Sequence, residues 1–285
     1  MIFGHRAVFP LFLWVAACPG RNNDAQPTAA DHGEASQAAE DAAGKTPAGA
    51  AAPYQLAAVD DKGRLIESGS LEVTVEWPNP EAELLRSPGP SDCGELEGPP
   101  VSVHVLHGVR EVVVWLAGVA LGRAPAPAAT VELAVRGCRF HPQVAVAPCL
   151  GARLAVESDD ERRHEVVLEF LGSDGPELIA RIPMPLIGQR FEIPLDSPGV
   201  VRARRVGGAS TCAYVHVPAH PYMALTDEQG KVTFAEVVPG TYNVVAWHRP
   251  LSAAGDPVTV SAEVVVVAGE QGQLTMSMEG EGGAR

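Results

Sequence analysis

The sequence predicts an all-β fold, because turn-forming residues are abundant, apolar runs are short and no helical repeat is present. The 285 residues include 29 glycines and 25 prolines, which interrupt the chain at short intervals. Between these interruptions lie β-branched runs with two-residue alternation, the pattern of strands in a sandwich. A chain of this length can bury a substantial core in one large or two small domains.

The net charge and the N-terminal segment limit the possible roles. A formal charge of −14 argues against nucleic acid as a partner, because phosphates would be repelled. Residues 7–17 form an apolar run that ends directly at Cys18, after Val-Ala-Ala. This ending resembles a bacterial lipobox, in which residues 1–18 are the lipoprotein signal and Cys18 carries lipid. An ordinary cleaved signal peptide is the alternative. Both interpretations predict export.

Residues 19–53 are predicted to form a disordered tether. They consist largely of Ala, Gly, Pro and acidic residues, and such a segment cannot bury enough surface to offset its ordering entropy. The C-terminal residues 280–285 are predicted to be a disordered tail. Beyond the N-terminal run, no apolar stretch reaches the length needed to span a bilayer.

The middle of the chain, residues 54–217, reads as a series of strands. Residues 71–77 alternate, which predicts a half-buried strand with Leu71, Val73, Val75 and Trp77 on one face. Residues 111–116 are apolar on both faces and predict a central strand. Proline-rich residues 172–198 are expected to be irregular. Further strands are expected at 101–106, 130–135, 143–147, 153–157, 164–170, 200–206 and 213–217.

Residues 218–279 predict a β-meander. Between 220 and 248 the pattern reads strand, turn, strand, turn, strand, and Asp227 to Gly230 supplies the first turn, with Gly230 free to adopt positive φ. Such a meander is stable only when its apolar face packs on a second sheet. Strands at 258–267 and 273–278 would close that sandwich.

Two stretches resemble known families. The sequence TDEQGKVTFAEVVPGTYNVVAWH at 226–248 resembles the signature of carboxypeptidase-regulatory-like β-domains. Upstream, VELAVRGCRFHPQ and DDERRHEVVLEF resemble bacterial periplasmic cupredoxin-like domains of the methylamine-utilisation or plastocyanin type. The resemblance implies a cupredoxin-like Greek-key β-sandwich over 54–217, followed by a carboxypeptidase-regulatory-like β-meander over 218–279.

The cupredoxin resemblance also implies a place for type 1 copper, held by two imidazoles, a thiolate and a weak axial thioether. His164 matches the family's first ligand, at a strand start after a charged loop. An ungapped register puts the other three ligands on Arg205, Gly208 and Thr211. None of these residues can supply the required donor, so we expect a degenerate site without copper.

A second register offers Cys212, His216 and Met223 as the downstream donors. On a strand, however, Cys212 and His216 would lie about 13 Å apart. Two donors of one metal must each lie ~2.0–2.3 Å from it. His164, Cys212 and His216 therefore remain candidate metal ligands only if this segment is a loop.

Four further cysteines favour disulfides in an exported protein, with three possible pairings. They are Cys93, Cys138, Cys149 and Cys212. In chains of the resembling family an early Cys-Gly and a later G-C-x-F-x-P occur together, which implies Cys93–Cys138. The pair Cys149–Cys212 follows by elimination.

Catalytic motifs such as G-x-S-x-G, H-E-x-x-H or a glycine-rich phosphate loop before a helix are missing from the sequence. We therefore expect a non-enzymatic lipoprotein of the bacterial cell envelope, on the periplasmic side or cell surface. Its lipid would enter the membrane, and its β-module would bind another envelope protein or a glycan. One alternative is a periplasmic copper-binding electron-transfer protein. The other is a carbohydrate-binding module, with candidate aromatic contacts at Trp77, Trp115, Tyr214, Tyr222 and Trp247.

Overall fold

The computed structural model describes residues 53–87, 89–90, 93–94, 98–207, 212–251 and 255–279. Cys18, the signal segment 1–18, tether residues 19–52 and the tail 280–285 lie outside these ranges. All regular elements within the described ranges are β-strands, so the predicted all-β class is confirmed. The described part of the chain contains no helix long and apolar enough to cross a membrane.

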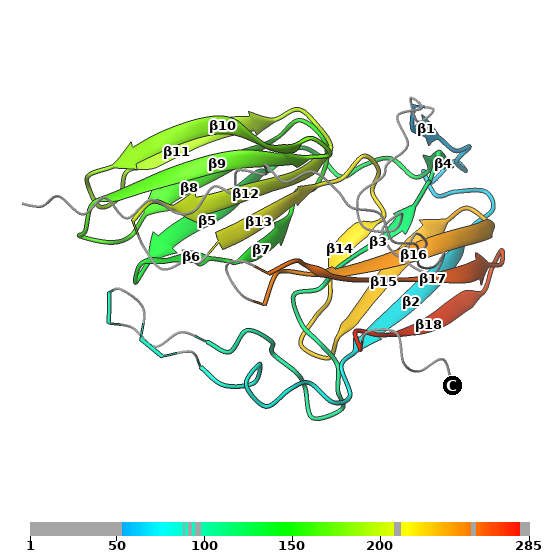
Figure 1. Ribbon diagram of the computed structural model, residues 1–285. Coiled ribbons are helices and arrows are strands. Elements are labelled where there is room, and N and C mark those ends of the chain that lie inside the picture. The colour runs from blue at the N-terminus through cyan, green and yellow to red at the C-terminus, as the bar shows by residue number, and fades with distance from the viewer. Residues whose placement is uncertain are drawn as a thin grey trace, which may run out of the picture. The chain divides into compact units, whose positions relative to one another are not determined.

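One sandwich, which we call the inserted sandwich, is built from residues 130–217 (Figure 1). Its five-stranded sheet has the order β10-β9-β12-β13-β7 and its four-stranded sheet the order β11-β8-β5-β6. Their apolar faces enclose a single core. The strands are β5 (Thr130–Arg136), β6 (Arg139–His141), β7 (Val144–Val146), β8 (Ala152–Ser158), β9 (His164–Gly172), β10 (Gly175–Met184), β11 (Arg190–Leu195), β12 (Gly199–Arg205) and β13 (Cys212–Val217).

A second sandwich, the outer sandwich, combines residues from both sides of the inserted one. Its sheets have the orders β14-β3-β16-β17 and β15-β2-β18, with a small parallel pair β1-β4 beside them. The strands are β1 (Gln55–Leu56), β2 (Gly69–Glu76), β3 (Val113–Ala117), β4 (Leu121–Gly122), β14 (Met223–Leu225), β15 (Lys231–Val237), β16 (Gly240–His248), β17 (Val258–Val266) and β18 (Gln271–Ser277).

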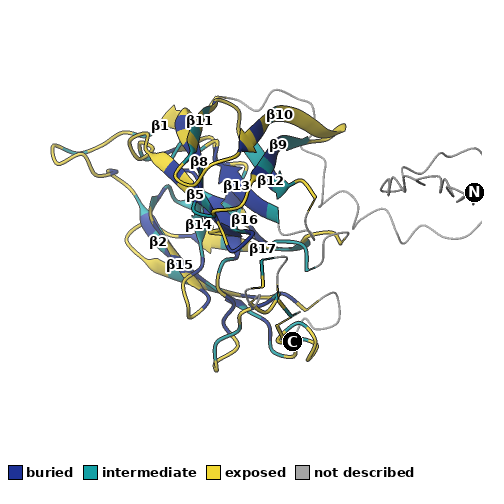
Figure 2. Ribbon diagram, turned by 90° about the vertical axis from the view of Figure 1, so that its left-hand side faces the viewer, coloured by how far each residue is buried: buried dark blue, intermediate teal, exposed yellow. Residues whose placement is uncertain are grey.

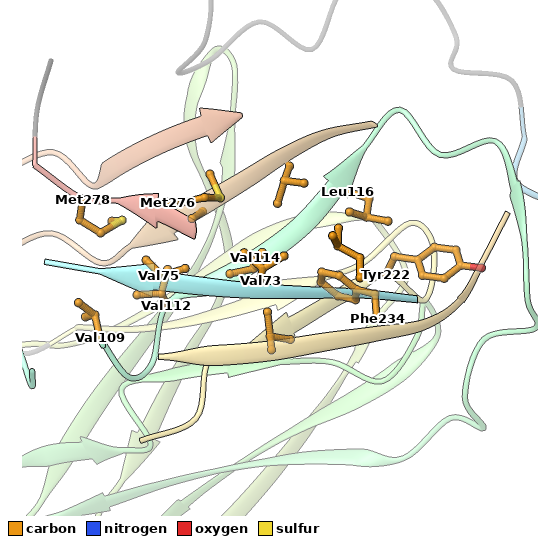
Figure 3. Close-up of a cluster of buried hydrophobic side chains, with 14 of the residues drawn as sticks. Val73, Val75, Val109, Val112, Val114, Leu116, Tyr222, Phe234, Met276 and Met278 are labelled. Carbon is orange, nitrogen blue, oxygen red and sulfur yellow. The ribbon is translucent and has the colours of Figure 1, made fainter. Parts of the chain in front are cut away.

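This pairing differs from the expected division at residue 217. Strand β2 lies between β15, its antiparallel partner, and β18, its parallel partner, and Figure 1 shows the cyan β2 beside the red β18. Its predicted one-sided burial is confirmed, since Leu71, Val73, Val75 and Trp77 are buried. These side chains pack with residues of β3, β15 and β18 in one core (Figure 3). The alternation specified a half-buried strand but carried no information about which sheet the strand joins.

Strand β3 is the central strand that its two apolar faces predicted. It pairs with β14 on one side and β16 on the other. Val114 and Leu116 point into the core of the outer sandwich. Val113 and Trp115, on the opposite face, pack in a separate cluster with residues of the inserted sandwich. Both faces are therefore covered by protein.

The expected meander at 220–248 is replaced by an alternation between two sheets. β14 and β16 belong to the four-stranded sheet, whereas β15, between them in sequence, belongs to the three-stranded sheet. The predicted turn before β15 is present. Asp227 Oδ1 accepts the backbone N–H groups of Gln229 and Lys231, at 2.9 and 2.8 Å. Gly230 has φ +77°, and a Cβ there would lie 2.5 Å from the carbonyl oxygen of Val75, so glycine is needed.

Two other expectations for local structure were wrong. Residues 172–198 contain β10 and β11, although prolines suggested irregular chain. Both are edge strands of their sheets. Proline has no backbone N–H to donate, and an edge strand tolerates it because one of its sides has no partner strand. Figure 2 shows most of β10 in the colour of exposed residues. Residues 101–106, predicted as a strand, form only an isolated bridge at Val103 followed by a turn in which His107 has φ 67°.

Candidate functional site

The first candidate ligand, His164, begins β9 and is buried, with 1% of its side chain exposed. Its Nε2 lies 2.8 Å from Oδ2 of Asp160. Asp160 also accepts the backbone N–H groups of Gly137 and Cys138, at 2.7 and 2.9 Å. Burial raises the pKa of Asp160, but these N–H groups and His164 together outweigh it, so the pKa is lowered overall. An ionised Asp160 thus holds the imidazole in one orientation.

The other ring nitrogen of His164, Nδ1, is buried and has no hydrogen-bond partner among the described residues. A histidine held by a carboxylate through one nitrogen, with the other nitrogen open, is the usual arrangement of a metal-binding imidazole. The remaining donors decide whether that one imidazole belongs to a metal site.

Arg205, at the position where the ungapped register put the family's cysteine, pairs with the strand that His164 begins, two residues along from His164. It ends β12 and is the pairing partner of Val166, and the next residue donates its N–H to the carbonyl of Glu165 at 2.9 Å. The Arg205 Nε donates to the carbonyl oxygen of Cys138 at 3.2 Å. A guanidinium is a permanent cation with no lone pair to offer, so it opposes a metal at this point. Gly208 and Thr211 lie outside the described residues.

Cys212 and His216 lie on the wrong face of the sheet to join His164. In β13, Ala213, Val215 and Val217 point into the core of the inserted sandwich. Because side chains alternate along a strand, Cys212 and His216 point away from that core. His164 shares its face with Val166 and Leu168, which are core residues. The sheet therefore lies between His164 and the other two candidate ligands, and the three cannot bind one metal.

The residues on the outer face of β13 serve as packing contacts instead. The His216 ring lies 4.5 Å from that of Trp247 on β16, edge to face, and Tyr214 lies 5.3 Å from the same indole. Burial lowers the pKa of His216 to about 3, and its Nε2 has no partner within the described chain. Burial also raises the pKa of the Cys212 thiol. Met223, the axial ligand of the second register, begins β14 in the outer sandwich.

Of the two expected disulfides, Cys93–Cys138 is present, with a Cα–Cα distance of 5.6 Å. The expected Cys149–Cys212 bond is not formed, and both thiols are free. β7 and β13 are parallel, with Val144 opposite Tyr214. Cys212 begins β13, whereas Cys149 follows the far end of the parallel strand β7, so the two thiols lie toward opposite ends of this strand pair. A disulfide requires a Cα–Cα distance of about 4.4–6.8 Å.

The aromatic residues expected to contact a glycan are mostly covered. Trp77, Tyr214 and Trp247 are 7–8% exposed, and Tyr222 is fully buried. Trp77 lines a cavity of about 330 Å³ together with Asn79, Glu81 and Glu279. Its indole packs edge-on against His248, at 5.9 Å between ring centroids. Stacking on a sugar requires an open aromatic face, which these four side chains do not offer.

Comparison with known families gave one partial match. Residues 208–267 match the model of polysaccharide lyase family 4, domain II, which covers the end of the inserted sandwich and much of the C-terminal part. No curated protein matches the chain.

The similar solved structures include copper proteins. A Cu-containing nitrite reductase from Thermus scotoductus SA-01 is 18% identical over 34% of this chain, with a TM-score of 0.27. A purple cupredoxin from Nitrosopumilus maritimus is 16% identical over 31% of this chain and 99% of its own length, with a TM-score of 0.25. A reduced amicyanin with a tryptophan-to-tyrosine substitution is 13% identical over 37% of this chain and 98% of its own, with a TM-score of 0.27. The chain spans about a quarter (24%) of the nitrite reductase. Each similarity covers about a third of this chain, and function is inferred below from side-chain geometry.

Proposed function

We propose that this chain is a non-enzymatic exported lipoprotein whose β-sandwiches form a binding or structural module of the bacterial cell envelope. Lipid on Cys18 would enter the membrane, and residues 19–53 would tether the folded part. The cupredoxin-type metal site would be degenerate. Partners would be another envelope protein or a glycan, bound at sheet edges and long loops.

The observation that carries the proposal is the separation of the candidate ligands by the five-stranded sheet. His164 points to the core side, whereas Cys212 and His216 point to the opposite side, where His216 packs against Trp247 of the outer sandwich. Arg205, where the family's cysteine would lie, pairs with Val166 of β9, and its guanidinium donates to the carbonyl oxygen of Cys138. A redox copper needs its imidazole and thiolate donors around one point. Binding without a redox metal is the role that this geometry favours.

The edge of the inserted sandwich is the surface that best suits a protein partner. Strand β10 pairs only with β9, so its second edge is open. The strand is interrupted between Leu178 and Ala180, where Leu178 and Ile179 are 56% and 42% exposed. At the loop after β10, Leu186 and Ile187 are 68% and 59% exposed. Open edges and exposed apolar side chains are what a strand or loop of a partner contacts.

The metal part of the proposal is tested by adding Cu(II) to the purified full chain and removing the excess. We expect less than stoichiometric copper by elemental analysis and no intense blue thiolate absorption. The His164→Ala and Cys212→Ser variants should match the wild-type chain in this measurement. Stoichiometric copper with a blue band that both substitutions abolish would overturn the degenerate site. It would make electron transfer the function.

The anchor is tested separately, with a radioactive or clickable fatty acid supplied to cells that express the chain. We expect label in the wild-type chain, recovered with membranes, and none in Cys18→Ala, recovered in the soluble fraction. Cys149→Ser is the matched control, because it removes a cysteine that carries no disulfide. A wild-type chain without label would contradict the lipoprotein assignment.

A further inference from the structure

The two segments that connect the sandwiches border a cavity of about 360 Å³. One wall comes from the connector that contains Arg123 and Ala126. The second comes from the end of β7 and Pro148, and the third from residues 218–225. This volume is within the range of pockets that hold small organic molecules, about 300–1,000 Å³. At ~30 Å³ for each water-sized group, it has room for about twelve non-hydrogen atoms.

The walls of the cavity are apolar and offer few groups to a polar ligand. Three prolines line it, Pro148, Pro218 and Pro221, and proline has no backbone N–H. The nearby N–H of Ala147 is already donated to the carbonyl of His216 at 2.8 Å. Met223 adds a thioether from β14, which is paired with β3 through Trp115. A ligand body in contact with these walls must therefore be apolar.

Arg123 alone is charged among the residues that line the cavity. Within the described part of the chain, its guanidinium makes no ion pair with a carboxylate, and its buried Nε has no acceptor. One Nη donates to the carbonyl of Pro221 at 3.3 Å, and the guanidinium carbon lies 5.8 Å from the centre of the Tyr222 ring. In a chain with a formal charge of −14, a cation without a carboxylate partner in an apolar cavity is unusual.

Arg123 is also held in place before any ligand arrives. Its backbone N–H donates to the Tyr222 hydroxyl at 3.0 Å, and its carbonyl accepts the Tyr54 hydroxyl at 2.6 Å. The Tyr222 hydroxyl donates in turn to the carbonyl of Glu236 at 2.6 Å. These bonds fix the backbone of Arg123, and the contacts with Pro221 and the Tyr222 ring position its guanidinium. The remaining N–H groups match a carboxylate, which accepts two parallel hydrogen bonds from an arginine.

We propose that this cavity binds a small monocarboxylate with a compact apolar body, its carboxylate on Arg123 and its body against the proline walls. The proposal rests on the binding role proposed above and specifies one ligand class for it. The copper measurement concerns His164 and its surroundings, and the fatty-acid label concerns Cys18. Either of those tests can therefore fail while the carboxylate site is confirmed, and the carboxylate site can fail while both are confirmed.

Benzoate is a probe of suitable size and charge, and benzamide is its neutral counterpart. We expect calorimetric titration of the full chain to show at least tenfold tighter binding of benzoate than of benzamide. Amide NMR signals of Ala126, Ala147 and Ala224, which line the cavity, should shift on titration. Acetate, with the same charge but almost no apolar body, should bind more weakly than benzoate.

Two substitutions distinguish the contribution of the Arg123 charge from that of the cavity volume. Arg123→Gln should weaken benzoate at least tenfold and leave benzamide unchanged, because only the ion pair is lost. Ala126→Phe should weaken both compounds by filling the cavity. Ala126 is exposed, so this variant should fold as the wild type does. Arg181→Gln is the matched control, since Arg181 is exposed on β10, at the opposite edge of the sheet from β7.

Three results would overturn the proposal. They are no benzoate binding by the wild-type chain, equal affinity for benzoate and benzamide, and unchanged benzoate affinity in Arg123→Gln. Circular dichroism of each variant verifies the fold. If Arg123→Gln is misfolded, the Ala126→Phe comparison and the NMR shifts decide the question alone.

Discussion

The two sandwiches of this protein have similar cores but differ in how their strands are distributed along the chain. The inserted sandwich uses one continuous segment, residues 130–217. The outer sandwich pairs residue 70 with residue 271, on β2 and β18, across the whole insertion. Closing a longer loop costs little more, about 0.6 kcal/mol for each doubling of length. A domain can therefore be inserted into another without preventing the outer one from forming its sheets.

The contact between the two sandwiches is also different in character from either core. The cores consist almost wholly of aliphatic side chains with some aromatics. The contact cluster contains Tyr214, Trp115 and Trp247, with His216 against the Trp247 indole. A buried imidazole makes this contact dependent on pH, which the aliphatic cores are not.

The largest expected effects come from removing the same side chain from each core. Leu71 and Leu168 are both fully buried, one in each sandwich. Leu71→Ala and Leu168→Ala should each lower the free energy of unfolding by about 2–5 kcal/mol, measured in urea. Because the cores are separate, limited proteolysis of Leu71→Ala should cleave the outer sandwich first and leave 130–217 intact. Leu168→Ala should show the reverse. Identical cleavage patterns would mean that the two cores unfold as one unit.

The disulfide is expected to have the next largest effect, because it joins the two sandwiches. Cys93 follows β2 of the outer sandwich, and Cys138 lies in the turn between β5 and β6, 45 residues further along. The double substitution Cys93→Ser and Cys138→Ser should lower the free energy of unfolding by about 2–4 kcal/mol. Cys149→Ser is the control and should change it by less than ~0.5 kcal/mol. If the double variant and the wild type unfolded at the same urea concentration, the disulfide would not contribute to stability.

The smallest expected effect concerns pH at the contact between the sandwiches. The pKa of His216 is about 3 in the folded protein, against 6.5 for an ordinary imidazole. The unfolded state therefore binds the proton more readily, and the stability that His216 contributes is complete above pH 6.5 and is lost as the pH falls towards 3. Between pH 7 and pH 5 the loss should be about 2 kcal/mol. His248, with a pKa lowered to about 4 by burial, adds to it.

The variant His216→Phe isolates that contribution. Phenylalanine keeps the aromatic contact with Trp247 and cannot be protonated, so its unfolding free energy should fall less between pH 7 and pH 5 than that of the wild type. The difference between the two proteins, measured by urea unfolding at both pH values, should be about 2 kcal/mol. Equal pH dependence would show that His216 is not the group that titrates.

Local patterns predicted the strands well and their partners poorly. The alternation of 71–77 located β2 and its buried face, and the doubly apolar 111–116 located β3 as a central strand. Neither pattern distinguishes one sheet from another, so both strands were expected in the wrong sandwich. The strands β10 and β11 were missed because their prolines suggested irregular chain. Proline is tolerated in edge strands, but which strands lie at an edge is known only from the assembled sheet.

The candidate metal site shows the same limit at the level of single residues. The sequence located His164 at a strand start, beside a charged loop that supplies Asp160. It also indicated Arg205 as the residue in place of the family's cysteine. No signal in the sequence pointed to Arg123, whose open guanidinium depends on segments near residues 148 and 221. A single arginine between a glycine and an alanine has no local pattern that marks it as a binding residue.

By itself, the sequence determined the all-β class, the position of most strands, the buried face of β2 and the central place of β3. These properties follow from local causes, namely side-chain alternation, β-branching and turn residues such as Asp227 and Gly230. The tertiary structure alone decided that β2 and β3 complete the C-terminal sheets, that Cys212 and His216 face away from His164, and that Cys149 cannot reach Cys212. Those outcomes depend on which strands pair across long distances in the chain, and the free energy of that pairing comes from burying whole faces together.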